Sequence, residues 1–154
     1  MRSKADNLKL IVTVSLRPLE AAHFRGVANV APREADPLWQ VGHAAFDAWR
    51  ALVTPFDREG SVEARFGEVF HGRRSQEPWG KDRPQPAPVF AWWQDVLTRA
   101  QETLQSHALA ENLPAPIAFT AYTVDTVGDA YDYVLYHTSF HAGLAQAALR
   151  SRAV

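Results

Sequence analysis

Two histidines near the C-terminus stand four residues apart, in the stretch His137-Thr-Ser-Phe-His141. In an α-helix, side chains four residues apart have Cβ atoms about 5–6 Å from each other, so both imidazoles can face one point. Apolar residues recur around them at three- and four-residue spacing, which places both histidines on the inward face of a predicted helix. An imidazole buried without a partner is costly. A divalent metal ion is a partner that two neutral imidazoles can share.

His43 is the candidate for a third ligand. It lies at the edge of the apolar stripe of a predicted helix over residues 37–53, which Asp36 can cap and Pro37 can begin. Three protein nitrogens would leave coordination positions open for water or substrate, as in catalytic zinc sites. Because only neutral imidazoles bind a metal, binding should weaken as the pH falls through about 6.5.

Other interpretations of these residues compete with a metal site. The histidine pair could lie at the edge of the core and form hydrogen bonds with Tyr133 or Tyr136. Asp47, one turn after His43, could orient that imidazole through its other ring nitrogen, but we favour an exposed helix residue at this position. The remaining histidines lack comparable spacing and are interpreted as ordinary residues, although a loop could fold His71 over the site; they are His23, His71 and His107.

Four helices are predicted to position these residues. Residues 5–30 are ambiguous between strand and helix, and we favour a first helix that is bent or broken at Pro18. The other helices are predicted over residues 37–53, 88–109 and 123–152. No strand is convincing. The predicted fold is therefore all-α, an antiparallel four-helix bundle that builds its metal site from facing helices.

A long connection joins the second and third predicted helices. Residues 54–88 contain four glycines and five prolines, and connections of this length are usually functional or mobile. We expect a mobile flap near the metal, with a short helix over residues 61–70. The segment 71–83 is locally basic, which leaves nucleic-acid binding through this loop as an alternative. We favour a solvated surface loop, because no glycine-rich phosphate motif or basic–aromatic pattern is present.

Composition narrows the classes of function. The 154 residues are 47% hydrophobic and 21% charged, which predicts one globular domain over residues 1–154. A formal net charge of -1 argues against nucleic acid and membrane as partners. The absence of cysteine excludes disulfides, cysteine-ligated zinc and a thiol nucleophile of the protein itself. The apolar run at residues 10–14 is too short for a signal peptide or a membrane span, so we expect a cytoplasmic protein.

Two short motifs resemble a known family. Trp39-Gln-Val-Gly-His43 resembles the first-ligand segment of the DinB/YfiT-like metalloprotein superfamily, and His137-Thr-Ser-Phe-His141-Ala-Gly143 resembles its closing H-x-x-x-H-x-G segment. The similarity in helix order extends over nearly the whole chain, but only these motifs are specific. The resemblance implies a four-helix bundle, commonly a homodimer, in which His43, His137 and His141 bind a divalent ion such as zinc or nickel. Its members include hydrolases and S-transferases that use thiols such as bacillithiol, mycothiol or glutathione.

This chain departs from the family pattern at Leu144, where many relatives carry glutamine three residues after the last histidine. The nearest amide is that of Gln146, on another helix face, which puts any role of the glutamine in doubt.

The resulting expectation is a metal-dependent hydrolase or low-molecular-weight-thiol S-transferase. The metal would activate water or the thiolate of a small-molecule cofactor and so supply the reactive group that a cysteine-free chain lacks. The alternative is a non-catalytic metal-binding protein, associated with stress responses, that acts by interaction. The sequence indicates neither the substrate nor a catalytic residue beyond the ligands.

Overall fold

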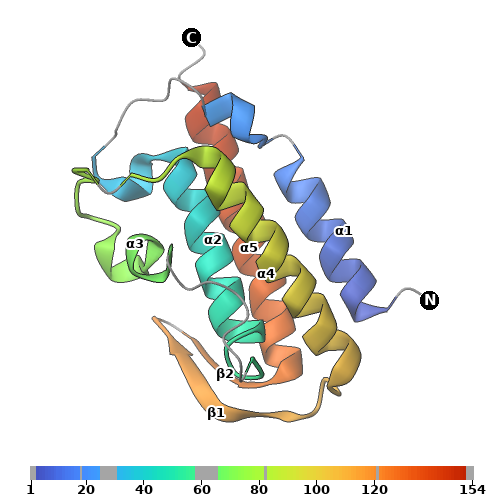
Figure 1. Ribbon diagram of the computed structural model, residues 1–154. Helices are drawn as coiled ribbons and strands as arrows, with labels where there is room; N and C mark the ends of the chain where they lie inside the picture. Colours follow the sequence, from blue (N-terminus) through green and yellow to red (C-terminus); the bar gives the residue numbers. More distant parts are fainter. Residues whose placement is uncertain are drawn as a thin grey trace.

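The computed structural model describes residues 3–17, 19–24, 31–57, 66–81, 83–120 and 122–151. Four long helices run side by side, and each contacts two of the others: α2 and α1 both pack against α4 and α5 (Figure 1). A short helix α3 and a two-stranded antiparallel sheet lie beside them. The long helices are α1 (Lys4–Leu16), α2 (Pro37–Leu52), α4 (Pro86–Ser106) and α5 (Val127–Arg150). The smaller elements are η1 (Ala21–Phe24), η2 (Arg33–Ala35), α3 (Gly67–Phe70), η4 (Gly72–Arg74), β1 (Asn112–Phe119) and β2 (Tyr122–Thr126).

The two helices that carry the histidines begin at residues whose side chains cap them. Asp36 caps α2 by accepting a hydrogen bond from the Leu38 amide, and Pro37 occupies the first turn, as predicted. Thr126 caps α5 in a reciprocal pair with Asp129, in which each side chain bonds the backbone amide of the other residue. These caps fix the residue at which α2 and α5 each begin.

The predicted all-α four-helix bundle is wrong, because β1 (residues 112–119) and β2 (residues 122–126) pair as an antiparallel sheet. Asn112 pairs with Thr126 and Ile117 with Val124, with an irregular register between these pairs. Pro114 and Pro116 fall within that irregular stretch, where a missing amide donor is tolerated. Prolines weaken the sequence pattern of a strand, and the helix predicted from residue 123 begins only at Val127. The fold is therefore mixed, with five α-helices and one small sheet among the described residues.

Residues 10–14 belong to α1, so the part of the ambiguous segment before Pro18 is a helix. Its inward face places Leu8, Val12 and Leu16 in the core. Pro18, at which we predicted a bend, lies outside the described residues.

Described residues of the connection between α2 and α4 belong to the core, which contradicts the prediction of a flap that is separate from it. Phe70 and Trp79 are only 0% and 2% exposed. The buried Arg33 side chain reaches across the connection and donates to the carbonyls of Val69 and Pro78, at 3.0 and 3.2 Å. Residues 58–65 of this connection lie outside the described part, so the predicted helix over 61–70 is seen only as α3.

Gly42 permits close packing between α2 and the ring of Phe70. A Cβ atom at Gly42 would lie 2.2 Å from the Phe70 ring, whereas one at Gly143 on α5 would meet nothing within 4 Å. We expect Gly42→Ala to lower the free energy of unfolding by about 1–3 kcal/mol, because the overpacking outweighs the gain in helix propensity. The matched change Gly143→Ala should raise it by up to about 1 kcal/mol. Urea unfolding of both variants checks this, and equal effects would contradict the packing argument.

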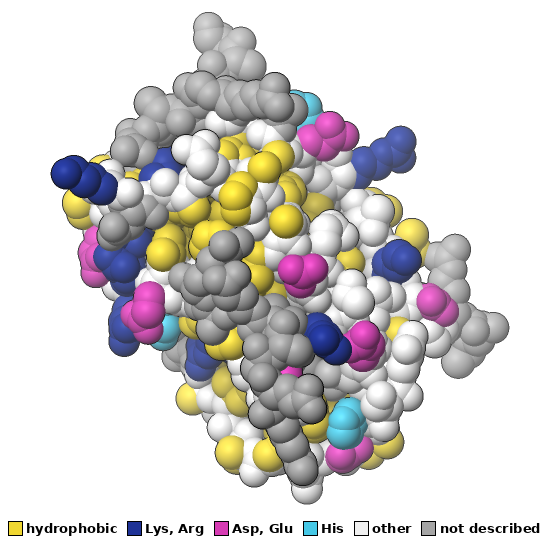
Figure 2. All heavy atoms as spheres, in the orientation of Figure 1, with side chains coloured by type: hydrophobic (Ala, Val, Ile, Leu, Met, Phe, Trp, Pro, Cys, Tyr) yellow, Lys and Arg dark blue, Asp and Glu magenta, His cyan; other side chains and the backbone are white. Residues whose placement is uncertain are grey.

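Charged side chains of both signs are interspersed over the face shown in Figure 2. Arg–Glu ion pairs among the described residues include Arg74 with Glu77 at 2.8 Å and Arg99 with Glu102 at 2.8 Å. Each helix in the described ranges is too short or too polar to pass through a lipid bilayer.

Candidate metal centre

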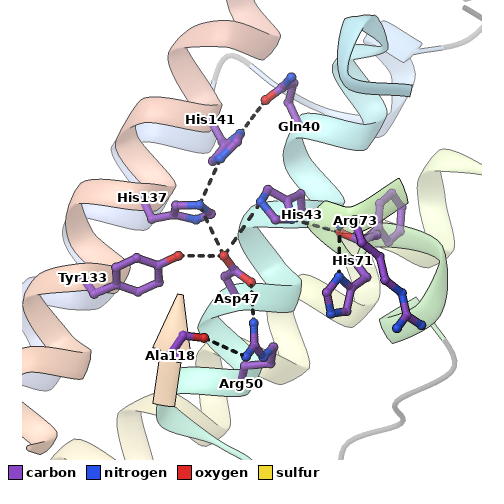
Figure 3. Close-up of polar contacts among 11 residues, drawn as sticks. Gln40, His43, Asp47, Arg50, His71, Arg73, Ala118, Tyr133, His137 and His141 are labelled. Carbon is purple, nitrogen blue, oxygen red and sulfur yellow. Dashed lines mark hydrogen bonds and ion pairs between the residues drawn. The ribbon is translucent and has the colours of Figure 1, made fainter. Parts of the chain in front are cut away.

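His43, His137 and His141 meet between α2 and α5. One ring nitrogen from each lies within 4.8 Å of those of the other two. His43 and His141 are buried and His137 is half-buried (Figure 3). The helical spacing predicted that the pair on α5 would face one point, and the packing of α2 against α5 brings His43 to the same point. The three residues together could bind a metal ion.

Two of the imidazoles are held by hydrogen bonds on the nitrogen that faces away from this point. The Nδ1 of His43 donates to the carbonyl of Phe70 at 2.9 Å. The Nδ1 of His141 donates to the side-chain oxygen of Gln40, whose amide nitrogen in turn donates to the carbonyl of Glu34. Because each Nδ1 carries the proton, each Nε2 presents a lone pair. Hydrogen bonds of this kind fix the tautomer and orientation of metal-ligating histidines.

His137 completes the group from within the same helix as His141. Its Nε2 lies 3.1 Å from the Nε2 of His141. Ligand atoms of a tetrahedral zinc ion with bonds of about 2.0–2.1 Å are separated by about 3.3 Å, so this spacing suits two ligands of one ion. The Nδ1 of His137 is buried and has no hydrogen-bond partner among the described residues.

Burial keeps the three imidazoles neutral. It lowers the pKa of His137 to about 2, with further lowering by the charges of His141 and His43. It lowers the pKa of His141 to about 3, again with a contribution from His43. Burial also lowers the pKa of His43, although the Asp47 carboxylate and the Phe70 carbonyl oppose the effect. Neutral imidazole is the form that binds a metal, and proton competition moves below the ordinary histidine range.

Asp47 is buried, which contradicts the prediction of an exposed helix residue. It is 4% exposed. Its Oδ2 lies 3.3 Å from His137 Nε2 and 3.8 Å from His43 Nε2, on the side of the rings that faces the centre. The Phe70 carbonyl, not Asp47, bonds the other nitrogen of His43. The spacing of one helical turn between His43 and Asp47 was the sequence signal that could have placed Asp47 in the site. The inward direction of its side chain, however, depends on the packing of α5.

Within the described part of the chain, neither Tyr133 nor Tyr136 forms a hydrogen bond with the histidine pair, contrary to the competing interpretation. Tyr133 donates its hydroxyl to Asp47 Oδ2 at 2.7 Å, and its ring stacks on His137 at a centroid distance of 5.0 Å. Burial and the negative charge of Asp47 raise the pKa of Tyr133, so its hydroxyl remains a donor. Tyr136 is 69% exposed. Sequence reasoning also missed Gln40, which reaches His141 from another helix.

A cavity of about 700 Å³ adjoins the histidines on the side of Asp47. His71 and Gly72 form part of its wall, so the connection after α3 does fold against the site, as considered for His71. The tip of the hairpin supplies Phe119, which stacks on Tyr133 at 4.0 Å. Arg50 also lines this cavity and donates to the Ala118 carbonyl at 3.3 Å. The hairpin that the sequence did not predict therefore forms one wall beside the site.

A second cavity of about 570 Å³ lies next to His43 and His141. Leu144 lines it together with Trp39 and Phe140. Leu144, the position at which the sequence departs from the family pattern, is therefore part of an apolar wall close to the site.

His107 and His23 are ordinary residues, as predicted from their spacing. His107 lies apart from both cavities and pairs with Glu111 at 2.8 Å, and His23 accepts a local hydrogen bond from the Glu20 amide.

Comparisons with protein-family models, with curated proteins and with solved structures give no match to this chain.

Proposed function

We propose that this protein binds one divalent metal ion, Zn²⁺ or Ni²⁺, through His43, His137 and His141 and acts as a metal-dependent hydrolase or thiol S-transferase of the DinB/YfiT-like kind. The convergence of three ring nitrogens within 4.8 Å carries the proposal. Hydrogen bonds to Phe70 and Gln40 support it, since they aim two of the three lone pairs inward. The resemblance in the motifs around His43 and His141 points the same way.

An enzymatic role is supported by the cavity of about 700 Å³ on the Asp47 side, which is large enough for a small substrate beside the metal ligands. When bound, the metal would act as a Lewis acid that lowers the pKa of a water molecule or of a thiol. The chain supplies the surroundings of that chemistry. Phe119 and Tyr133 form an aromatic wall, and Arg50 brings a positive charge to the same cavity. A small electrophile, or a thiol with a carboxylate, would suit these walls.

The homodimer that the resemblance implies is likewise a proposal. Exposed apolar side chains on α5 offer a surface for a second copy; they are Tyr136, Phe140 and Leu144.

Turnover assays test the enzymatic proposal. Chelator-treated protein should be inactive toward electrophilic chromogenic acceptors with a thiol, or toward chromogenic esters and amides without one. Added Zn²⁺ or Ni²⁺ should restore the activity in the native protein but not in His141→Ala, because that variant lacks a ligand. Stoichiometric metal without turnover in either assay would instead support a non-catalytic metal-binding protein. A thiol requirement would separate the transferase from the hydrolase.

A further inference from the structure

The α2 helix presents two groups to the site, not one. His43 and Asp47 are one turn apart on α2, and His137 and His141 are one turn apart on α5. Asp47 Oδ2 lies 3.3 Å from His137 Nε2, close to the 3.1 Å between the Nε2 atoms of His137 and His141. Both spacings are near the separation of about 3.3 Å between ligand atoms of a tetrahedral zinc ion. In Figure 3 the carboxylate points into the space between His43 and His137.

The carboxylate of Asp47 is buried, and its ion pair with Arg50 reaches Oδ1 and not Oδ2, the oxygen that faces the histidines. Its side chain is 6% exposed, and Arg50 Nη1, its ion-pair partner among the described residues, lies 3.8 Å from the other oxygen, Oδ1. That guanidinium also packs over the Phe119 ring and bonds the Ala118 carbonyl. A buried carboxylate is costly unless a cation or several hydrogen bonds compensate it. A divalent ion among the histidines would provide that compensation at Oδ2.

Tyr133 fixes the oxygen that faces the histidines. Its hydroxyl donates to Oδ2 at 2.7 Å, and its ring is held between Phe119 and His137 at centroid distances of 4.0 and 5.0 Å. A carboxylate oxygen has two lone pairs, so Oδ2 can accept from Tyr133 and still bind a metal. Ligating carboxylates are commonly held by such hydrogen bonds.

We propose that Asp47 is a fourth protein ligand of the metal and that Tyr133 is the residue that positions it. The site would then consist of two pairs of ligands, each pair spaced by one helical turn on a different helix. This inference rests on the proposed metal site and adds to it a negatively charged oxygen ligand. Four protein ligands fill a tetrahedron, so an ion that accepts five or six ligands would keep positions open toward the cavity on the Asp47 side.

Calorimetric titration with Zn²⁺ and visible spectra with Co²⁺ test this assignment. We expect Asp47→Ala to lower the Zn²⁺ affinity more than about 100-fold, beyond the usual cost of losing a residue that only orients a ligand. Asp47→Asn keeps the shape of the side chain and should also bind weakly, while Tyr133→Phe should lose about tenfold. The spectrum of bound Co²⁺ should change in both Asp47 variants, because it reports the ligands, and stay unchanged in Tyr133→Phe. The exposed Asp95 on α4 provides the matched control, Asp95→Asn.

Two results would overturn the assignment. One is a Zn²⁺ affinity of Asp47→Asn and Asp47→Ala within about threefold of the native value, well under the cost of losing even an orienting residue. The other is weaker binding with an unchanged Co²⁺ spectrum, which would make Asp47 an orienting residue only. Circular dichroism shows whether each variant is folded. If Asp47→Ala is not folded, the Zn²⁺ affinity and Co²⁺ spectrum of Asp47→Asn test the assignment. Native protein that binds no metal would refute the three-histidine site itself, whereas native binding without an Asp47 effect refutes only this assignment.

Discussion

His43→Ala, His137→Ala and His141→Ala are each expected to lower the affinity for Zn²⁺ by more than about 100-fold, because each removes a direct ligand. The three ring nitrogens lie within 4.8 Å of one another, so each can supply one bond to the same ion, and each variant loses one of these bonds. Titration of chelator-treated protein measures the effect. His107→Ala is the control, since that residue pairs with Glu111 outside the site.

The His43 variant is the most informative of the three. His137 and His141 could hold a metal weakly as a local pair on one helix, whatever α2 contributes. Unchanged affinity and stoichiometry in His43→Ala would therefore eliminate the site between α2 and α5 and leave only that pair.

The metal-free protein is expected to lose about 3 kcal/mol of stability between pH 7.5 and 5.5 from His137 and His141 alone. Their pKa values are lowered to about 2 and about 3 in the folded protein, against about 6.5 in the unfolded chain. The unfolded state therefore binds more protons as the pH falls below about 6.5, and the folded state does not until the pH approaches the lowered values. The free energy of unfolding is therefore highest above about pH 6.5 and decreases as the pH falls below that value. Urea unfolding at the two pH values measures the loss.

Added metal should raise stability at both pH values. Metal at 100 times its dissociation constant contributes about 2.7 kcal/mol if it binds only the folded state. His137 and His141 are neutral in the folded protein at pH 5.5, so most of this metal-induced increment should persist there. Competition between protons and metal for these imidazoles, which the sequence placed near pH 6.5, should therefore begin at lower pH. A double variant, His137→Ala with His141→Ala, should lose the increment and the share of the pH dependence that these two histidines contribute, while His43 keeps its own share. Equal stability of metal-free native protein at the two pH values would contradict the burial argument.

The sequence predicted the histidine group because helical spacing alone decides which side chains share a face. His137 and His141 are one turn apart on α5, and His43 lies on a helix whose cap and first proline were visible at Asp36 and Pro37. These are local signals. Such signals depend on nearby residues and not on contacts with distant segments.

The surroundings of the site depend on contacts between distant segments, and these were not visible. Asp47 is turned inward by Tyr133 from α5, and His141 is oriented by Gln40 from α2. The hairpin wall was missed because Pro114 and Pro116 weaken the strand pattern, and the burial of Phe70 and Trp79 was masked by the glycines and prolines around them. Periodicity identifies a face of a helix, but only packing shows what lies opposite it.

The metal content of untagged protein tests the central claim most directly. Elemental analysis of protein purified without a histidine tag, followed by chelator treatment and reloading with Zn²⁺ or Ni²⁺, gives the stoichiometry of the native site. The account predicts one tightly held divalent ion per chain in the native protein and none in a variant with alanine at His43, His137 and His141. Native protein that retains no ion and takes up none on reloading, or a triple variant that binds as much as the native chain, would contradict it.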